Sequence, residues 1–339
     1  MRSKPTQQID ELINVMRISL ELALPVNYRV ADVLAFHGRD SEQVSERCVS
    51  MYSEYQTQSG QALSSTLEKA ILWDGFPACL SIQFGAQAAA AILDLDLPAR
   101  QSIKSNQATQ WRGGLQNIVV RMLGLNQDIA VFRKQYAHHP NIGELIQQRP
   151  SLRVPLSANP FEALCWAVTG QQISVSAAVS IRRRFIQQLG TLHSSGLRCH
   201  PSPSQVVACD IEELRTTGLS KSKAQTLILL AQAIDTGQLL LPKAAAKLMD
   251  HASAEVLRGQ LLAIKGIGPW TVNYVLLRGF AYLDGSLHGD VAVRRSLQIL
   301  LGQEVKVTER GAEQWLAQFS PWRALVAAHL WAMQADQVY

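Results

Sequence analysis

The segment that decides the fold is IKGIGPWT, residues 264–271. Helical periodicity precedes it in AEVLRGQLLA (residues 254–263) and continues after it in VNYVLLRGFA (residues 272–281). Two closely spaced glycines let the backbone turn sharply, and a proline suits the first turn of the next helix. The free amides at that helix start favour an anion such as phosphate. The segment therefore predicts two antiparallel helices joined by a hairpin, which either grips a phosphate or is a simple glycine-capped corner.

Composition and charge indicate a folded chain with a basic C-terminal part. The 339 residues are 47% hydrophobic and 17% charged, which suits a folded protein of two or three domains. Residues 1–150 hold 14 Lys and Arg residues against 14 Asp and Glu residues, whereas residues 151–339 hold 18 against 13 and supply the whole net charge of +5. This asymmetry weakly favours a polyanionic partner.

Cysteine spacing and hydropathy exclude several classes of protein. The five cysteines include no C-x-x-C pair, which argues against a zinc site, an iron–sulfur cluster and a disulfide framework. The N-terminus lacks the apolar core of a signal peptide, and apolar stretches such as AQAAAAILDLDL (residues 86–97) are short and contain charges. We therefore expect no membrane span and a reducing, cytoplasmic setting.

The patterns that precede the helical part indicate an antiparallel sheet with one or two helices. ISLELALP (residues 18–25) alternates apolar and polar residues, and YRVADVLAFHGRD (residues 28–40) has helical periodicity. EKAILWDGFPACLSIQF (residues 68–84) indicates two strands around the turn WDGFP. From residue 106 onward helical periodicity dominates.

The expected fold class is therefore α+β, an antiparallel β domain followed by an all-helical body. Segment 1–16 is expected to be an N-terminal extension and residues 17–105 an antiparallel β/α domain. The helical body is expected over residues 106–339, with the helix-hairpin-helix at 254–280.

One helix of that body, ISVSAAVSIRRRFIQQL (residues 173–189), follows the polar pair Gln171-Gln172. Its periodicity places four residues on the inner face: Ile173, Ala177, Val179 and Phe185. The run Arg182–Arg184 falls outside that face, where a solvated helix surface is the favoured interpretation.

A third motif, HGD, lies in FAYLDGSLHGDVAVRRSLQIL (residues 280–300). Asp290 stands at the start of a predicted helix, where a carboxylate is a common N-cap. Capping alone explains an aspartate here, so the residues themselves leave capping and catalysis open.

Taken in order along the chain, these motifs resemble the helix-hairpin-helix (HhH-GPD) DNA glycosylase superfamily, and within it the AlkA-type 3-methyladenine DNA glycosylase II branch. The resemblance covers roughly residues 17–335 and rests on four stretches: FEALCWAVTGQQIS (161–174), GIGPWTVNY (266–274), LHGD (287–290) and PWRALVAAHLWAMQ (321–334). It implies a TATA-binding-protein-like β domain before the helical body. It also implies a monofunctional enzyme of base excision repair, which flips alkylated purines out of DNA and hydrolyses the N-glycosidic bond to leave an abasic site.

The resemblance also assigns roles to individual residues. Asp290 matches the catalytic aspartate, whose charge would stabilise an oxocarbenium-like sugar. Trp270, Tyr274 and Trp331 match the aromatic residues of a base pocket, which would bind a cationic flipped base by stacking and cation–π attraction. Strand-nicking members carry a Schiff-base lysine where this chain has Trp270.

Contacts with DNA follow from the same resemblance. Gln172 matches the wedge residue that enters the DNA gap, which is a leucine in a bacterial member of this branch. Gly289 stands where that member has a second aspartate. Phosphate contact falls to four hairpin residues, Lys265, Gly266, Ile267 and Gly268. A monovalent cation at the hairpin carbonyls is possible in this superfamily, but no other cofactor and no side-chain metal site are expected.

Other positions are candidates only. Lys221 and Lys223 could form a basic rim or a solvated helix end, and Phe36 and Arg39 align loosely with the edge of the pocket. The expected partner is double-stranded DNA containing alkylated bases, bound by a monomer without membrane contact in the cytoplasm and associated with the nucleoid. The alternatives are an oxidised-purine DNA glycosylase and a non-catalytic helix-hairpin-helix DNA-binding protein.

Overall fold

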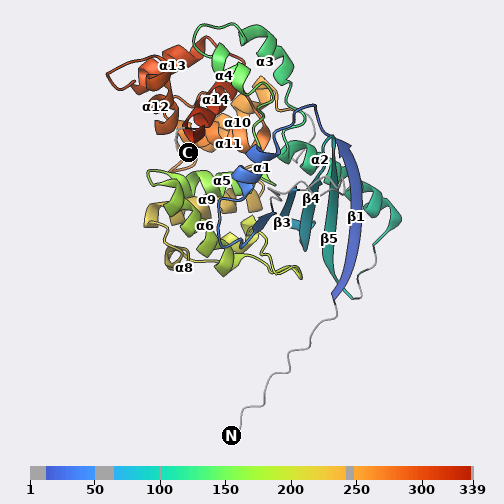
Figure 1. Ribbon diagram of the computed structural model, residues 1–339. Coiled ribbons are helices and arrows are strands. Elements are labelled where there is room, and N and C mark those ends of the chain that lie inside the picture. The colour runs from blue at the N-terminus through green and yellow to red at the C-terminus, as the bar shows by residue number, and fades with distance from the viewer. Residues whose placement is uncertain (1–12, 50–64, 100, 102, 242–247, 337–339) are drawn as a thin grey trace.

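The computed structural model describes residues 13–49, 65–99, 101, 103–241 and 248–336. A twisted sheet lies beside a larger helical body (Figure 1). Within the described ranges, every helix is too short or too polar to cross a bilayer. The antiparallel sheet followed by helices confirms the predicted α+β class.

The sheet has five antiparallel strands in the order β1-β5-β4-β3-β2. Their bounds are β1 (Ile13–Ala23), β2 (Glu46–Val49), β3 (Ser65–Trp73), β4 (Phe76–Phe84) and β5 (Ala88–Pro98). β3 and β4 pair around Asp74 and Gly75, whose φ values of 47° and 86° suit a tight hairpin turn. The predicted strands around WDGFP are therefore confirmed. β1 begins inside the segment expected as an N-terminal extension, of which residues 1–12 lie outside the described residues.

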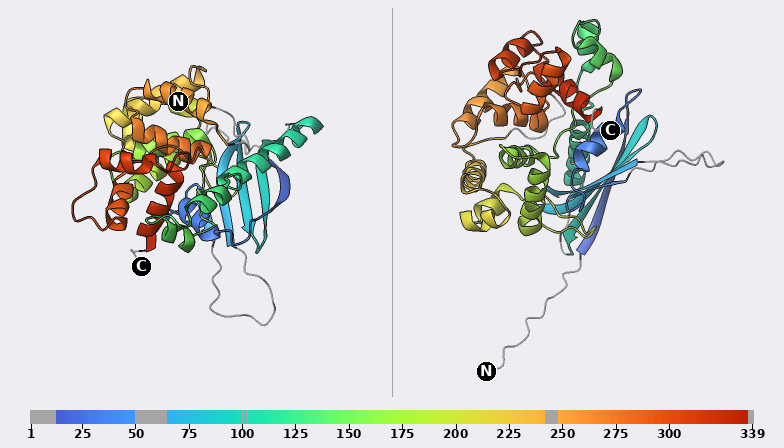
Figure 2. Two further views of the ribbon diagram at one scale, coloured as in Figure 1. Left: turned by 90° about the horizontal axis from the view of Figure 1, so that it is seen from above. Right: turned by 60° about the vertical axis from the view of Figure 1, so that its left-hand side comes forward.

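The helix α2 (Ser105–Met122) covers one face of the sheet, as the view from above in Figure 2 shows. Its Trp111 and Leu115 pack with alternate residues of β5, such as Leu93 and Leu95, in one apolar core. Sequence reasoning left β5 unassigned. Because β5 lies between β1 and β4, both of its edges are paired, which accounts for a strand in this alanine-rich stretch.

The helical body is built around α11 (Pro269–Phe280), of which residues 271–280 are all buried. It packs against α5, where Gly279 approaches Pro160 and Ala163 closely. The remaining helices are α1 (Val30–His37), α3 (Ile129–Tyr136), α4 (Gly143–Gln148), α5 (Pro160–Gly170), α6 (Val175–Leu189), α7 (Pro203–Val207), α8 (Ile211–Thr216), α9 (Lys221–Asp235), α10 (His251–Leu262), α12 (Val291–Leu300), α13 (Glu309–Ala317) and α14 (Arg323–Asp336).

The prediction that Arg182–Arg184 form a solvated face is wrong for Arg182 and Arg183, whereas Arg184 is exposed as expected. Arg182 donates hydrogen bonds to Glu46 at 2.6 Å and to Glu162 at 2.8 Å, and its side chain is only 13% exposed. Arg183 pairs with Asp40 at 2.7 Å, and Arg184 donates to the carbonyl of Thr217 at 2.6 Å. Ile173, expected on the inner face, is 38% exposed, whereas Val179 and Phe185 are buried as predicted.

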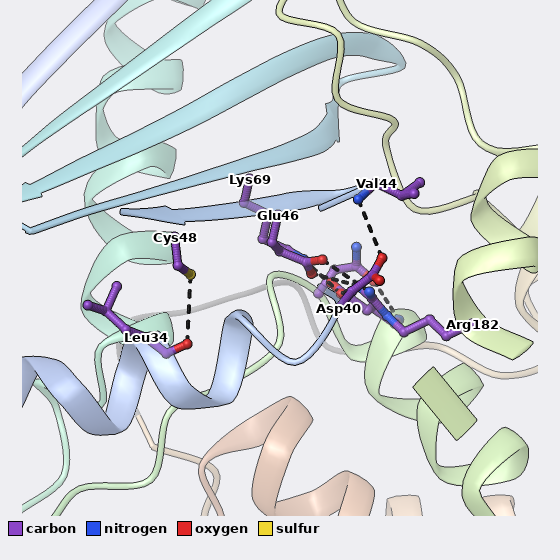
Figure 3. Close-up of polar contacts among 9 residues, drawn as sticks. Leu34, Asp40, Val44, Glu46, Cys48, Lys69 and Arg182 are labelled. Carbon is purple, nitrogen blue, oxygen red and sulfur yellow. Dashed lines mark hydrogen bonds and ion pairs between the residues drawn. The ribbon is translucent and has the colours of Figure 1, made fainter. Parts of the chain in front are cut away.

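Arg182 belongs to a buried charge cluster, defined here as Lys69, Glu46, Glu162 and Arg182 (Figure 3 labels three of them). Lys69 is fully buried and donates to both glutamates. Burial alone would raise the pKa of each glutamate, but the two cations lower both pKa values well below the ordinary range. Because the members come from β3, β2, α5 and α6, the cluster fastens the sheet to the helical body.

Candidate active site

The predicted hairpin joins α10 to α11. Gly266 has a φ of +92°, and a Cβ at this position would lie 2.1 Å from the hydroxyl oxygen of Thr226 on α9. Any other residue there would clash with the Thr226 side chain and would hold a strained left-handed backbone. Gly268 has an extended backbone at φ −108°, and a Cβ there would meet open space. Only one of the two glycines therefore uses the conformational freedom that the sequence suggested for both.

The four residues predicted to touch phosphate lie in and beside this turn. Lys265 and Gly266 are exposed, whereas the side chain of Ile267 is buried and its amide donates to the carbonyl of Ile264 at 3.1 Å. The amide of Ile267 is therefore already used. Among the described residues no side chain caps α11, which leaves the first amides of this helix to solvent or a ligand.

Two hairpin carbonyls already accept side-chain hydrogen bonds. Thr226 donates to the carbonyl of Lys265 at 3.1 Å, and Gln171 donates to that of Gly266 at 3.0 Å. A carbonyl oxygen has two lone pairs, and each of these two oxygens already uses one of them for a hydrogen bond. These residues therefore fit a monovalent cation only through the second lone pair of each oxygen. The cation at the hairpin stays a prediction.

Asp290 is the N-cap of α12 and lies half-exposed beside the start of α11. One carboxylate oxygen accepts from the amide of Val293 at 3.0 Å and from the indole of Trp331 at 3.1 Å. The other accepts from the indole of Trp270 at 2.9 Å. The structure thus confirms the cap and adds two donors that capping does not need. All three donors are neutral, and none of them is a counter-ion of the carboxylate.

The three aromatic residues predicted to line a pocket lie together next to this carboxylate. Trp270 and Tyr274 have ring centroids 5.4 Å apart, and Tyr274 and Trp331 have centroids 6.4 Å apart. Tyr274 is 7% exposed, whereas both tryptophans are partly open to solvent. Each indole therefore donates a hydrogen bond to Asp290 and also lies beside the ring of Tyr274.

Sequence reasoning missed Arg278, which stacks on this group from inside. Its guanidinium lies 5.4 Å from the ring centroid of Trp331 and 4.5 Å from that of Phe36 on α1. Arg39 lies 4.5 Å from the same Phe36 ring. Burial lowers the pKa of Arg278 to about 10, and the group still carries its charge at neutral pH. The spacing of Tyr274 and Arg278, four residues apart on one helix, is the signal that could have revealed it.

The predicted wedge residue Gln172 is exposed in the turn between α5 and α6. Its φ of +57° is unusual for a residue with a side chain and costs roughly 1–2 kcal/mol. Lys221 is exposed at the start of α9. Lys223 instead donates to the carbonyls of Thr169 and Gln171, at 2.9 and 2.7 Å, which is not the arrangement expected of a free basic rim.

A family model matches the part of the chain that carries this site. Residues 165–321, which contain the turn at Gln172, the hairpin and Asp290, match the HhH-GPD superfamily of base excision DNA repair proteins. The match covers just under half of the chain. The predicted superfamily is thereby confirmed.

One curated relative carries the name of the predicted branch. DNA-3-methyladenine glycosylase 2 of Escherichia coli (strain K12) is 30% identical over 198 residues, which are 58% of this chain and 65% of the relative. The matched part thus spans just under two thirds of that relative's length.

Solved structures agree on the fold. The 3-methyladenine DNA-glycosylase from Archaeoglobus fulgidus superposes with a TM-score of 0.71 at 17% identity, covering 92% of this chain and 97% of the other. Clostridium acetobutylicum 8-oxoguanine glycosylase/lyase in complex with DNA gives 0.66 at 12% identity, covering 97% and 99%. Both likenesses concern the fold alone, which does not separate alkylated from oxidised purines.

Proposed function

We propose that this protein is a monofunctional DNA glycosylase that excises alkylated purines of the 3-methyladenine type from double-stranded DNA. The observation that carries the proposal is the carboxylate of Asp290, which Trp270 and Trp331 hold by neutral hydrogen bonds. The name of the Escherichia coli relative supports the choice of alkylated bases.

Asp290 would act through its charge. As the bond between C1′ and the base nitrogen breaks, its electron pair leaves with the base and positive charge develops on the deoxyribose. A fixed anion beside the sugar lowers the energy of that state, and water then attacks C1′ and loses a proton. Because three hydrogen bonds already fix the carboxylate, it needs no reorganisation when the sugar charge develops.

The aromatic group would hold the flipped base. An alkylated purine carries positive charge and leaves readily, so it needs little protonation. Stacking on Trp270 and Tyr274 would add about 1–2 kcal/mol of cation–π attraction. Arg278 already occupies a face of Trp331, and its charge opposes a second cation there. Selection in this proposal therefore rests on Trp270, Tyr274 and the quality of the leaving group.

The remaining parts concern the duplex and its products. Lys265, Gly266 and Gly268 with the first amides of α11 would bind a backbone phosphate, which positions the protein without reading sequence. Gln172 would fill the gap left by the flipped base. Trp270 in place of a Schiff-base lysine implies hydrolysis without strand cleavage. In this proposal the protein acts as a monomer and is associated with the nucleoid.

The test is release of bases from DNA treated with dimethyl sulfate. The purified protein should release free methylpurines, separable by chromatography, and strand breaks should appear only after hot alkali. A parallel duplex that contains 8-oxoguanine should release no free 8-oxoguanine.

Three other results would redirect the proposal. Breaks without alkali would contradict the argument from Trp270. Release of 8-oxoguanine alone would favour an oxidised-purine enzyme. Salt-sensitive DNA binding without any released base would leave a phosphate-gripping module.

A further inference from the structure

The turn that carries Gln172 is tied to the hairpin by polar contacts. We propose that Gln171 and Lys223 are positioning residues. They couple the wedge residue Gln172 to the hairpin that binds phosphate, so that the wedge and the hairpin move as one rigid unit when a base pair is opened. The inference rests on the proposed function and deepens it, because it concerns how that same site gains access to a paired base.

Gln171 makes the first part of the tether. Its side-chain amide donates to the carbonyl of Gly266 at 3.0 Å and to the hydroxyl of Thr271 at 2.9 Å. Both amide hydrogens are thus used, one in the hairpin turn and one in the first turn of α11. The residue before the wedge therefore fixes its distance to both sides of the phosphate-binding segment.

Lys223 makes the second part. Its amine donates to the carbonyls of Thr169 and Gln171, which lie three residues and one residue before Gln172. The amine is partly buried, so these two bonds repay some of its lost hydration. On the same helix, Thr226 donates to the carbonyl of Lys265 and packs into the space beside Gly266. Helix α9 therefore holds the wedge turn and the hairpin from one side.

The wedge turn needs such a tether because it has little apolar anchorage. Gln172 has a left-handed backbone, which persists only where surrounding contacts enforce it. The next residues offer no burial, since Ile173 is 38% exposed and Val175 is 64% exposed. Opening a base pair works against stacking and pairing, so a turn held only by its own backbone would yield before the pair does.

The experiment compares one lesion in two settings. A labelled strand with a single guanine and otherwise only pyrimidines is methylated to 7-methylguanine, then annealed so that the lesion faces either cytosine or a tetrahydrofuran abasic analogue. The second duplex has no pair to open. Base release is measured under single-turnover conditions for wild type, Gln171→Leu, Gln171→Glu and Lys223→Met.

The tether predicts a selective loss. Opposite cytosine, the Gln171 variants should slow release about tenfold, since two hydrogen bonds are lost. Opposite the abasic analogue they should stay within about twofold of wild type. Gln171→Glu keeps the shape but not the donors, so it should behave like Gln171→Leu, and Lys223→Met should show the same selectivity.

Gln205→Leu is the matched control, because Gln205 makes the same pair of bonds, to the carbonyl of Leu189 and the hydroxyl of Thr191, away from the wedge. It should leave the ratio between the two duplexes unchanged. Equal losses on both duplexes, or no loss, would overturn the tether, and thermal unfolding would show whether the variants fold.

A separate readout distinguishes failure of the tether from failure of the proposed function. If wild type releases no base from either duplex, the proposed activity on this lesion is contradicted. The tether is then judged by 2-aminopurine in the complementary strand, placed next to the cytosine that pairs with the target guanine, because its fluorescence rises when the stack opens. Wild type should raise it and Gln171→Leu should not. No difference between the two proteins would overturn the tether.

Discussion

The buried carboxylates of Glu46 and Glu162 and the carboxylate of Asp290 have opposite kinds of hydrogen-bond donors, charged in the first case and neutral in the second. Glu46 and Glu162 lie buried between Lys69 and Arg182, so their charges are cancelled within the cluster. Asp290 lies at the surface of the helical body and accepts hydrogen bonds only from an amide and two indoles. Among the described residues, no cationic side chain forms an ion pair with it.

The difference separates stability from chemistry. Opposite charges that cancel one another leave little field outside the cluster, but losing one partner strands a buried charge. Neutral donors orient a carboxylate without cancelling it, so its field remains for a cationic state of a substrate. The charge cluster should therefore influence unfolding, and Asp290 should influence base release.

Breaking the charge cluster should have the largest effect on stability. Lys69→Met leaves two glutamates facing one arginine in a buried site, and we expect the free energy of unfolding to fall by about 3–5 kcal/mol. Urea unfolding measures it, with the exposed Lys221→Met as a control that should stay within about 0.5 kcal/mol. Base release per folded molecule should not change. A loss below about 1 kcal/mol would show that the cluster is not what fastens the two parts.

Removing one neutral donor from Asp290 should affect the reaction instead. Trp331→Phe and Trp270→Phe each keep an aromatic ring but delete the indole donor, and each should slow base release about tenfold. Thermal unfolding should change little. Trp315→Phe, on α13 and packed against Phe319, is the matched control and should leave the rate unchanged. Rates equal to wild type in both site variants would mean that the indoles do not orient the carboxylate.

Acid should weaken the interior. Burial lowers the pKa of His37 to about 3 and of His200 and His329 to about 4, against about 6.5 in an unfolded chain. Below pH 6.5 the unfolded chain takes up protons that the native protein does not, so stability falls as pH falls. The expected loss between pH 7.5 and 5 is about 1–2 kcal/mol for each histidine.

The lowered pKa values of Glu46 and Glu162 add a further loss, which begins only when the unfolded glutamates protonate, below about pH 5. Urea unfolding across this range measures both steps, and His329→Phe should flatten the first. A free energy of unfolding that stays constant from pH 7.5 to 5 would contradict the assignment of buried, neutral imidazoles.

The wedge should show the smallest effect on stability. Gln172→Gly relieves a left-handed backbone but frees the unfolded chain, so stability should change by less than about 1 kcal/mol. Release of a base opposite cytosine should nevertheless fall, because glycine fills no space in the opened duplex. Unchanged release from the paired duplex would remove Gln172 from the wedge role.

Local signals predicted much of the fold. The hairpin at Gly266, the turn at Asp74 and Gly75, and the helix around Val33 each depend on a few neighbouring residues, and each is present. Arg182 could not be placed in the same way, because its partner Glu46 lies 136 residues earlier in the chain. The sequence alone therefore predicts a solvated surface for a run of arginines, because it does not show which distant carboxylates pair with them.

The candidate site divides along the same line. The order of motifs placed Trp270, Tyr274, Asp290 and Trp331 in one region, and the structure brings them together. That both indoles donate to the carboxylate, and that Arg278 stacks behind Trp331, depends on side-chain orientations that spacing does not specify.

The most direct test of the central claim is a paired measurement on Asp290→Asn. Asparagine caps a helix as well as aspartate does, so α12 should stay folded while the charge is lost. We predict that single-turnover base release falls by roughly 10³-fold, whereas the dissociation constant for a duplex with an abasic analogue changes by less than about tenfold. Release close to the wild-type rate would show that the uncompensated carboxylate does not carry the chemistry.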